Sequence, residues 1–162
     1  MIRLRFVHCP SIVGDAILLK TGGRFSHVEA VTPEGLYLGA HANGGVLARP
    51  SDYDRCQWSR QLFYVLPADD ATTAKFYHYL NAVVGEPYSF SAIAQFITDV
   101  NITQSHHVIC SALQMLALRG CEWFPTPLAY PAHEISPRDA MLLLSGRVPV
   151  PQELYPPQTG AT

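Results

Sequence analysis

The stretch Ser26–His41, SHVEAVTPEGLYLGAH, decides the fold that we predict for this chain. Residues 26–32 alternate in polarity, as a half-buried strand does, and residues 36–41 read as a second extended arm. Between them, residues 33–35 (PEG) supply the residue types of a tight turn. The stretch therefore predicts a β-hairpin whose turn is centred on position 34.

The predicted hairpin carries one histidine on each arm. His27 and Glu29 share one face of the first arm, because side chains alternate along a strand. With the turn centred on position 34, His27 falls across from His41, within reach of a cross-strand imidazole pair. Glu29 lies on the correct face to orient His27, although the sequence alone favours a solvated charge at this position.

The rest of the first half is expected to consist of strands and turns. Residues 15–20 (DAILLK) form a short apolar run that ends at the turn signal of residues 21–23 (TGG). Residues 46–49 follow a second glycine-rich turn, and residues 58–66 alternate as a further strand.

The second half changes to a helical period. Apolar residues recur at helical spacing between 70 and 84 and between 107 and 119, and residues 89–98 form a third helical candidate. Ser136 followed by Pro137 marks another helix start. We expect one domain over residues 1–148 and a proline-rich tail over residues 149–162.

Composition narrows the class of protein. With 162 residues, 48% of them hydrophobic and 15% charged, the chain is suited to one domain with a real core. The net charge of -2, without a Lys/Arg cluster, argues against a nucleic-acid partner. No apolar run reaches the length of a membrane span, and no signal-peptide pattern opens the chain, so we expect no stable membrane insertion and a cytoplasmic location. The oligomeric state stays open.

Cysteine spacing argues against two kinds of site. The four cysteines form no CxxC pair, so neither a disulfide framework nor a structural zinc site is expected. His107 and Cys110 lie three residues apart, but one such pair does not supply the four ligands of tetrahedral zinc. We therefore expect no metal and no cofactor.

Cys110 stands at the first turn of the predicted helix that spans residues 107–119. The helix dipole and a nearby imidazole both lower the pKa of a thiol, and His27 is the best candidate for that imidazole. His41 would then orient His27. The alternative is an inert core cysteine beside ordinary strand histidines, which is the usual role of a single buried cysteine.

These residues together resemble a known family. Residues 85–88 (GEPY) and the Cys110-Ser111 helix start are similar to motifs of papain-fold hydrolases of the NlpC type. Here the strand histidine, in Ser26-His27-Val28, precedes the cysteine, an order similar to the circularly permuted branch. Residues 38–50 and 136–139 add to this likeness, and lecithin:retinol acyltransferase-like enzymes have a similar order of two histidines and then cysteine.

The resemblance implies an α+β, papain-like fold with an antiparallel sheet or partial barrel packed against helices and the nucleophile at a helix N-terminus. It implies Cys110 as nucleophile, His27 as base and His41 as the residue that orients the base. Tyr88, with the backbone N–H of Cys110, would stabilise the oxyanion. Ser111 and Ser26 would complete the oxyanion and substrate-binding set.

The implied function is cleavage of an amide bond, with bacterial cell-wall peptide as the family's usual substrate class. A phage-associated role or delivery to the cell wall agrees with this reading. Acyl transfer or thioester hydrolysis on lipid or acyl substrates through the same triad is the first alternative, and a non-catalytic binding module is the second. Ser89 and Ala112 stand where many permuted members have acidic residues, which leaves the substrate pocket open.

Overall fold

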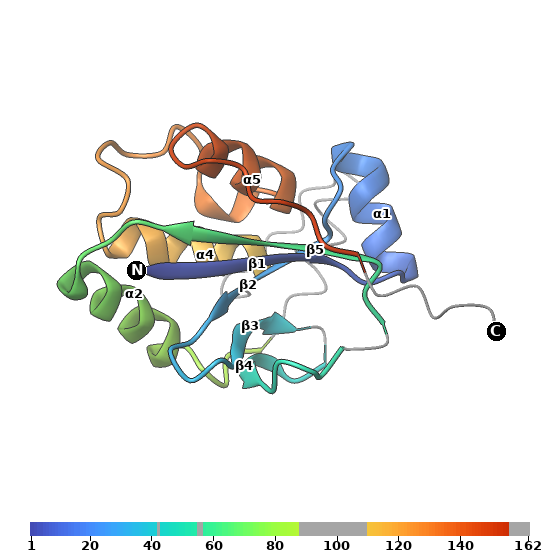
Figure 1. Cartoon of the computed structure of the whole chain (residues 1–162), viewed down its shortest axis with the longest axis horizontal. Helices are drawn as coiled ribbons and strands as arrows, with labels where there is room; N and C mark the ends of the chain where they lie inside the picture. Colours follow the sequence, from blue (N-terminus) through green and yellow to red (C-terminus); the bar gives the residue numbers. More distant parts are fainter. Residues whose placement is uncertain (42, 55–56, 88–109, 156–162) are drawn as a thin grey trace.

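The computed structural model describes residues 1–41, 43–54, 57–87 and 110–155. The chain has the predicted α+β architecture, with a five-stranded antiparallel sheet in the order β4-β3-β2-β1-β5 (Figure 1). The strands are β1 (Ile2–His8), β2 (His27–Val31), β3 (Tyr37–His41), β4 (Gly45–Arg49) and β5 (Arg60–Leu66). The helices described are α1 (Ile12–Thr21), α2 (Asp70–Ala82), α4 (Cys110–Gly120) and α5 (Pro137–Ser145), with a short 3-10 turn at Ala132–Glu134.

The hairpin prediction is confirmed, including its register. Ala30 pairs with Leu38 and Val31 with Tyr37, and both pairs are symmetric about position 34. The same register continued along the strands sets His27 opposite His41. The turn closes through Gly35, whose φ of +84° is costly for any residue with a side chain.

Strand β1 was not predicted from the sequence, although it lies between β2 and β5 in the sheet. Its apolar residues Leu4 and Phe6 are fully buried, but two arginines interrupt the pattern. Arg3 is exposed, whereas Arg5 is 1% exposed and pairs directly with Glu29 on β2. A buried arginine inside a strand is not detectable from local pattern, because its burial depends on partners elsewhere in the chain.

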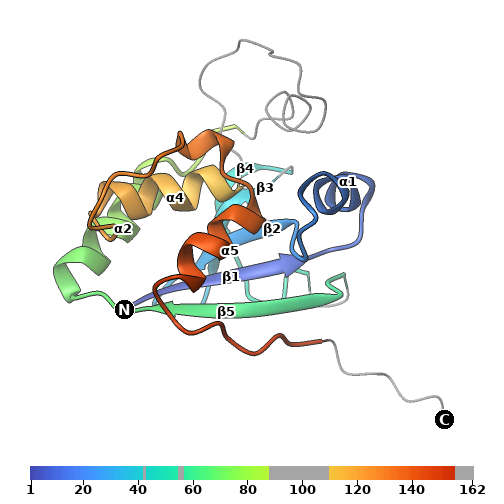
Figure 2. The ribbon, with the colours of Figure 1, turned by 90° about the horizontal axis from the view of Figure 1, so that it is seen from above.

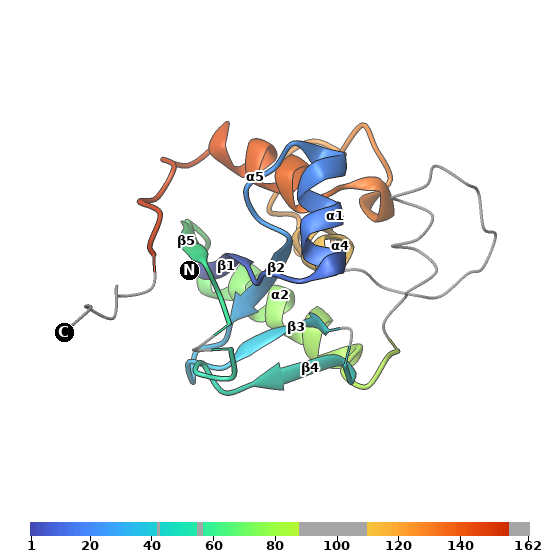
Figure 3. The same cartoon turned by 90° about the vertical axis from the view of Figure 1, so that its right-hand side faces the viewer.

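The expectation of strands and turns is wrong for residues 15–20, which lie within helix α1. The side chain of Ser11 accepts a hydrogen bond from the backbone of Gly14 and caps the helix start. Gly22, with a φ of 61°, ends it in the left-handed conformation. A short apolar run fits a strand or a helix equally well, and these two caps decide for the helix. Helix α1 lies at the end where the chain leaves β1 (Figure 3).

The later helices follow the sequence prediction wherever they lie within the described residues. Asp69 caps α2, and Ser136 caps α5 in a capping box with Asp139, with proline in the first turn. The candidate at residues 89–98 lies outside the described residues. Helix α4 packs against β2, β3 and α2 (Figure 2). Most of its side chains are buried, so the helix joins the helical layer to the sheet.

The segment around Gly85 and Glu86 is hydrogen-bonded to the start of β4. The backbone N–H of Val46 donates to the Glu86 carbonyl at 2.9 Å, and the N–H of Gly85 donates to the Val46 carbonyl at 2.8 Å. A Cβ atom on Gly45 would collide with the Glu86 carbonyl oxygen, and the φ of Gly45 is +73°. Gly45 is therefore required by both space and conformation.

We expect Gly45→Ala to lower the free energy of unfolding by roughly 2–5 kcal/mol, from left-handed strain and backbone overlap together. The matched control is Gly22→Ala, because Gly22 also has a positive φ of +61° but open space around its Cβ position. The control should lose only about 1–2 kcal/mol, since strain acts there alone. Urea denaturation of both variants measures the difference, and equal losses would contradict the crowding at Gly45.

The first residues of the proline-rich segment lie against the domain. Leu154 forms an antiparallel bridge with Gln61 of β5, and Glu153 is 2.8 Å from Arg24. None of the helices in the described part of the chain combines the length and the apolar composition needed to cross a bilayer.

Candidate active site

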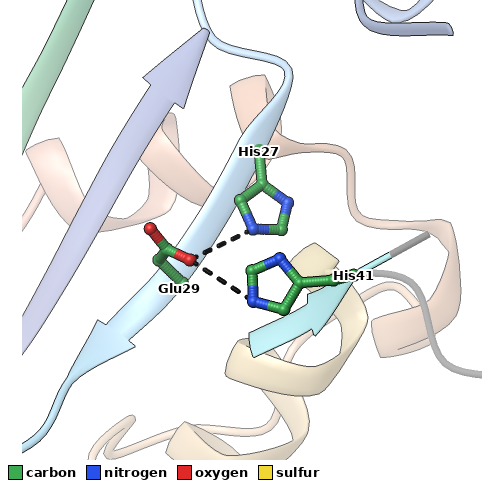
Figure 4. A group of neighbouring side chains, drawn as sticks. All are labelled: His27, Glu29 and His41. Carbon is green, nitrogen blue, oxygen red and sulfur yellow. Dashed lines mark ion pairs between the residues drawn. The ribbon is translucent and has the colours of Figure 1, made fainter. Parts of the chain in front are cut away.

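Three side chains of the hairpin converge at one end of the sheet: His27 and Glu29 from β2, and His41 from β3 (Figure 4). The two imidazole rings lie 5.0 Å apart between centroids and are tilted by 41°. Glu29 Oε2 is 3.4 Å from His27 Nε2 and 3.6 Å from His41 Nε2. The structure thus brings both predicted histidines together, with a carboxylate facing both.

The interpretation of Glu29 as a solvated charge is wrong, because its side chain is fully buried. Its Oε1 accepts a 2.7 Å hydrogen bond from Arg5 Nη1, which is also buried. Burial alone would raise the pKa of Glu29, but His27 and Arg5 outweigh that effect and hold it below its ordinary value. Glu29 is therefore ionised and faces both imidazole rings.

Arg5 belongs to a larger buried network behind the histidines. Its guanidinium also contacts Asp54, at 2.9 Å from Nη1 and 3.1 Å from Nη2, and its Nε donates to Gln61 at 2.6 Å. The hydroxyl of Tyr53 donates to Glu29 Oε2 at 3.2 Å. One arginine faces two buried carboxylates, so a second positive charge is favoured beside Glu29, and His27 at 3.4 Å is placed to supply it.

Cys110 is the first residue of α4 in the described part of the chain, and its buried side chain lies close enough to His27 for the two groups to shift each other's pKa. Burial alone would raise the pKa of the thiol, but His27 and the backbone N–H groups of Val28 and Ser111 lower it below its ordinary value. Burial alone would likewise lower the pKa of His27, yet the Cys110 thiolate and Glu29 raise it to about 10. The two groups favour a thiolate–imidazolium pair.

The rings of His27 and His41 differ in charge. Burial and the neighbouring His27 lower the pKa of His41 to about 3, so His41 is neutral at neutral pH. Since His27 Nε2 faces Glu29, its Nδ1 is the nitrogen left for the Cys110 thiol. His27 therefore stands between the sulfur and a buried carboxylate, with His41 at its side.

The remaining predicted site residues have different surroundings. Ser26 is 7% exposed, and its hydroxyl lies 3.1 Å from His8 Nδ1. Ser111 is fully buried, and within the described residues its hydroxyl has no hydrogen-bond partner, while its backbone N–H faces the Cys110 sulfur. Tyr88 lies outside the described residues.

Comparison with known proteins relates the chain to a solved fold. The sequence matches no protein-family model and no curated protein. Its structure is similar to that of the metalloprotein YiiX from Escherichia coli O157:H7, described as DUF1105, with a TM-score of 0.60 and 16% sequence identity. The match covers 96% of this chain and 88% of that chain, so the likeness extends over the whole fold.

Sequence reasoning missed the groups behind the histidines. Arg5, Tyr53 and Asp54 come from β1 and from the loop before β5, and no local pattern marks them as site residues. The one local indication of a polar network at this place was Glu29, which lies two positions after His27 on the same face of the strand. His27, Glu29 and His41 also offer three ligand atoms within 4.8 Å of one another, a spacing that suits a metal ion.

Proposed function

We propose that the protein is a cysteine hydrolase with papain-like site geometry, in which Cys110 is the nucleophile and His27 the acid–base residue. The observation that carries the proposal is that Cys110, buried at the start of α4, and His27 on β2 are close enough for each to shift the pKa of the other. An activated thiol beside an imidazole that is itself oriented by a third group is the arrangement that nucleophilic catalysis requires.

In the proposed reaction the Cys110 thiolate attacks the carbonyl carbon of an amide or ester. The His27 imidazolium donates its proton to the leaving group, and an acyl-enzyme remains on the sulfur. His27, now neutral, takes a proton from the attacking water, and the attack releases the acid and restores the thiolate–imidazolium pair. Glu29 stabilises the imidazolium, and His41 stays neutral beside it. The backbone N–H of Cys110 and the hydroxyl of Tyr88 remain the proposed donors to the oxyanion.

The substrate class that we propose is an amide bond in bacterial cell-wall peptide, in keeping with the likeness of the motifs to NlpC-type hydrolases. The same likeness extends the proposal to a phage-associated enzyme. Acyl transfer or thioester hydrolysis would use the same triad of Cys110, His27 and His41. The substrates tested therefore include an acyl ester.

The test compares cell-wall muropeptides with p-nitrophenyl butyrate as substrates for the wild type and for Cys110→Ala. We expect the variant to lose at least about 10³-fold in turnover on whichever substrate the wild type cleaves, because the covalent route disappears. Mass spectrometry of a quenched reaction should find the acyl group on Cys110.

The matched control is Cys9→Ala. Cys9 is a half-buried thiol near Asp54, and burial together with Asp54 raises its pKa to about 12, so it holds no thiolate at neutral pH. This variant should keep the wild-type rate within a fewfold range. A Cys110→Ala variant that retains most of the activity would overturn the proposal.

A further inference from the structure

Two buried imidazole nitrogens in the candidate site lack hydrogen-bond partners. His27 Nε2 and His41 Nε2 are inaccessible to solvent, and within the described residues neither forms a hydrogen bond of acceptable geometry. Both point toward Glu29 Oε2, at 3.4 Å and 3.6 Å (Figure 4). Buried polar atoms without partners are rare and destabilising, so their convergence on one oxygen indicates a ligand between them.

Two of the three spacings among these atoms match a metal ion in tetrahedral coordination. Zinc binds histidine nitrogen and carboxylate oxygen at about 2.0–2.2 Å, which separates neighbouring ligand atoms by about 3.3–3.6 Å. The two distances from Glu29 Oε2 fall in that range, and all three donor atoms lie within 4.8 Å of one another. Small rotations of two rings would complete the site.

We infer that His27, Glu29 and His41 form a binding site for one divalent transition metal of the zinc class. Two imidazole nitrogens and one carboxylate suit zinc, whereas magnesium and calcium prefer oxygen ligands. The three ligand atoms do not include the Cys110 sulfur.

The groups around Glu29 support a metal at this position. Arg5 holds Oε1 at 2.7 Å and so leaves Oε2 directed at the histidines, while Tyr53 donates to Oε2 at 3.2 Å. Such outer hydrogen bonds orient metal-binding carboxylates.

Occupation of the site would inhibit the hydrolase, a consequence that rests on the proposed function. A metal on Nε2 prevents His27 from cycling between imidazole and imidazolium, and the proposed reaction requires that cycle. The metal is therefore a reversible inhibitor of this enzyme and not its cofactor.

The test is a titration of chelator-treated full-length protein with Co²⁺, followed by displacement with Zn²⁺. We expect one Co²⁺ per chain, visible as d–d absorption bands in the visible range that Zn²⁺ abolishes. His41→Gln should weaken binding by about 100-fold or more, since a direct ligand is lost. His78→Gln, which removes an exposed histidine of α2, should leave the titration unchanged.

Two further measurements keep the result interpretable. Circular dichroism and thermal unfolding show whether His41→Gln is folded; if it is not, Glu29→Gln takes its place in the titration. Cys110→Ser should still bind one Co²⁺ per chain, because the thiol is not a ligand. Absence of stoichiometric binding, or equal binding by His78→Gln and the ligand variants, would overturn the inference.

The inference and the proposed function fail separately. A wild type that hydrolyses its substrate through Cys110 but binds no Co²⁺ refutes only the metal site. A protein that binds Co²⁺ through the three ligands but never acylates Cys110 refutes only the hydrolase. If both hold, Zn²⁺ should suppress turnover of p-nitrophenyl butyrate, and a chelator should restore it.

Discussion

Replacing His27 with alanine is expected to slow the alkylation of Cys110 by iodoacetamide at pH 6 by roughly 10- to 100-fold. In the wild type, His27 and two backbone N–H groups lower the pKa of Cys110, so a larger share of the thiol is ionised at that pH than in an ordinary cysteine. Without the imidazolium, an ordinary thiol with a pKa near 8.5 is only about 0.3% ionised at pH 6. The lower intrinsic reactivity of a low-pKa thiolate offsets part of this difference.

The effect of His27 should also appear in the pH dependence of Cys110 labelling. Labelling of wild-type Cys110 should depend less steeply on pH between 6 and 9 than labelling of His27→Ala, because the pKa of the thiol is lowered and that of His27 is raised. Labelling of His27→Ala should rise steadily over the same range as the unassisted thiol ionises. Peptide mapping by mass spectrometry separates Cys110 from Cys9, and His78→Ala serves as the control. Equal rates at pH 6 in the wild type and in His27→Ala would refute the ion pair.

Replacing Arg5 with methionine is expected to lower the free energy of unfolding by about 3–5 kcal/mol. The substitution leaves Glu29 and Asp54, which are 0% and 2% exposed, without their shared cation. Breaking a buried ion pair by removing one partner is costly, because the remaining charges stay desolvated. Chemical denaturation at pH 7 measures the loss.

Arg3→Met is the matched control, since Arg3 lies two residues earlier on the same strand but is exposed. Its effect should stay within about 0.5 kcal/mol. Adding Glu29→Gln and Asp54→Asn to Arg5→Met should recover part of the lost stability, because the buried charges left without a partner are removed. If Arg5→Met and Arg3→Met lose the same small amount, the network does not stabilise the fold as described.

Much of the sheet at the site was predictable from local sequence. The turn at residues 33–35 and the alternation on either side of it predict both the hairpin and its register, which places His27 across from His41. A strand repeats every two residues, so a turn of known centre fixes which side chains face each other. The start of α5 was predictable for a similar reason, because Ser136, Pro137 and Asp139 interact within one helical turn.

Prediction failed where the outcome depended on distant parts of the chain. Residues 15–20 fit a strand or a helix by pattern, and the caps at Ser11 and Gly22 decide for the helix. Strand β1 was missed because Arg5 resembles a surface residue until Glu29 and Asp54 are placed beside it. Glu29 was read as solvated for the same reason, although it is fully buried.

The sequence by itself determined the hairpin, its register and a helix that carries Cys110 near its start. Only the tertiary structure decided that Cys110 contacts His27, and that Glu29 faces both histidines with Arg5 and Asp54 behind it. The physical reason is the distance along the chain over which each interaction acts. Turns, caps and alternation act between residues a few positions apart, whereas the charge state of a buried group is set by whatever folding brings within a few ångströms of it.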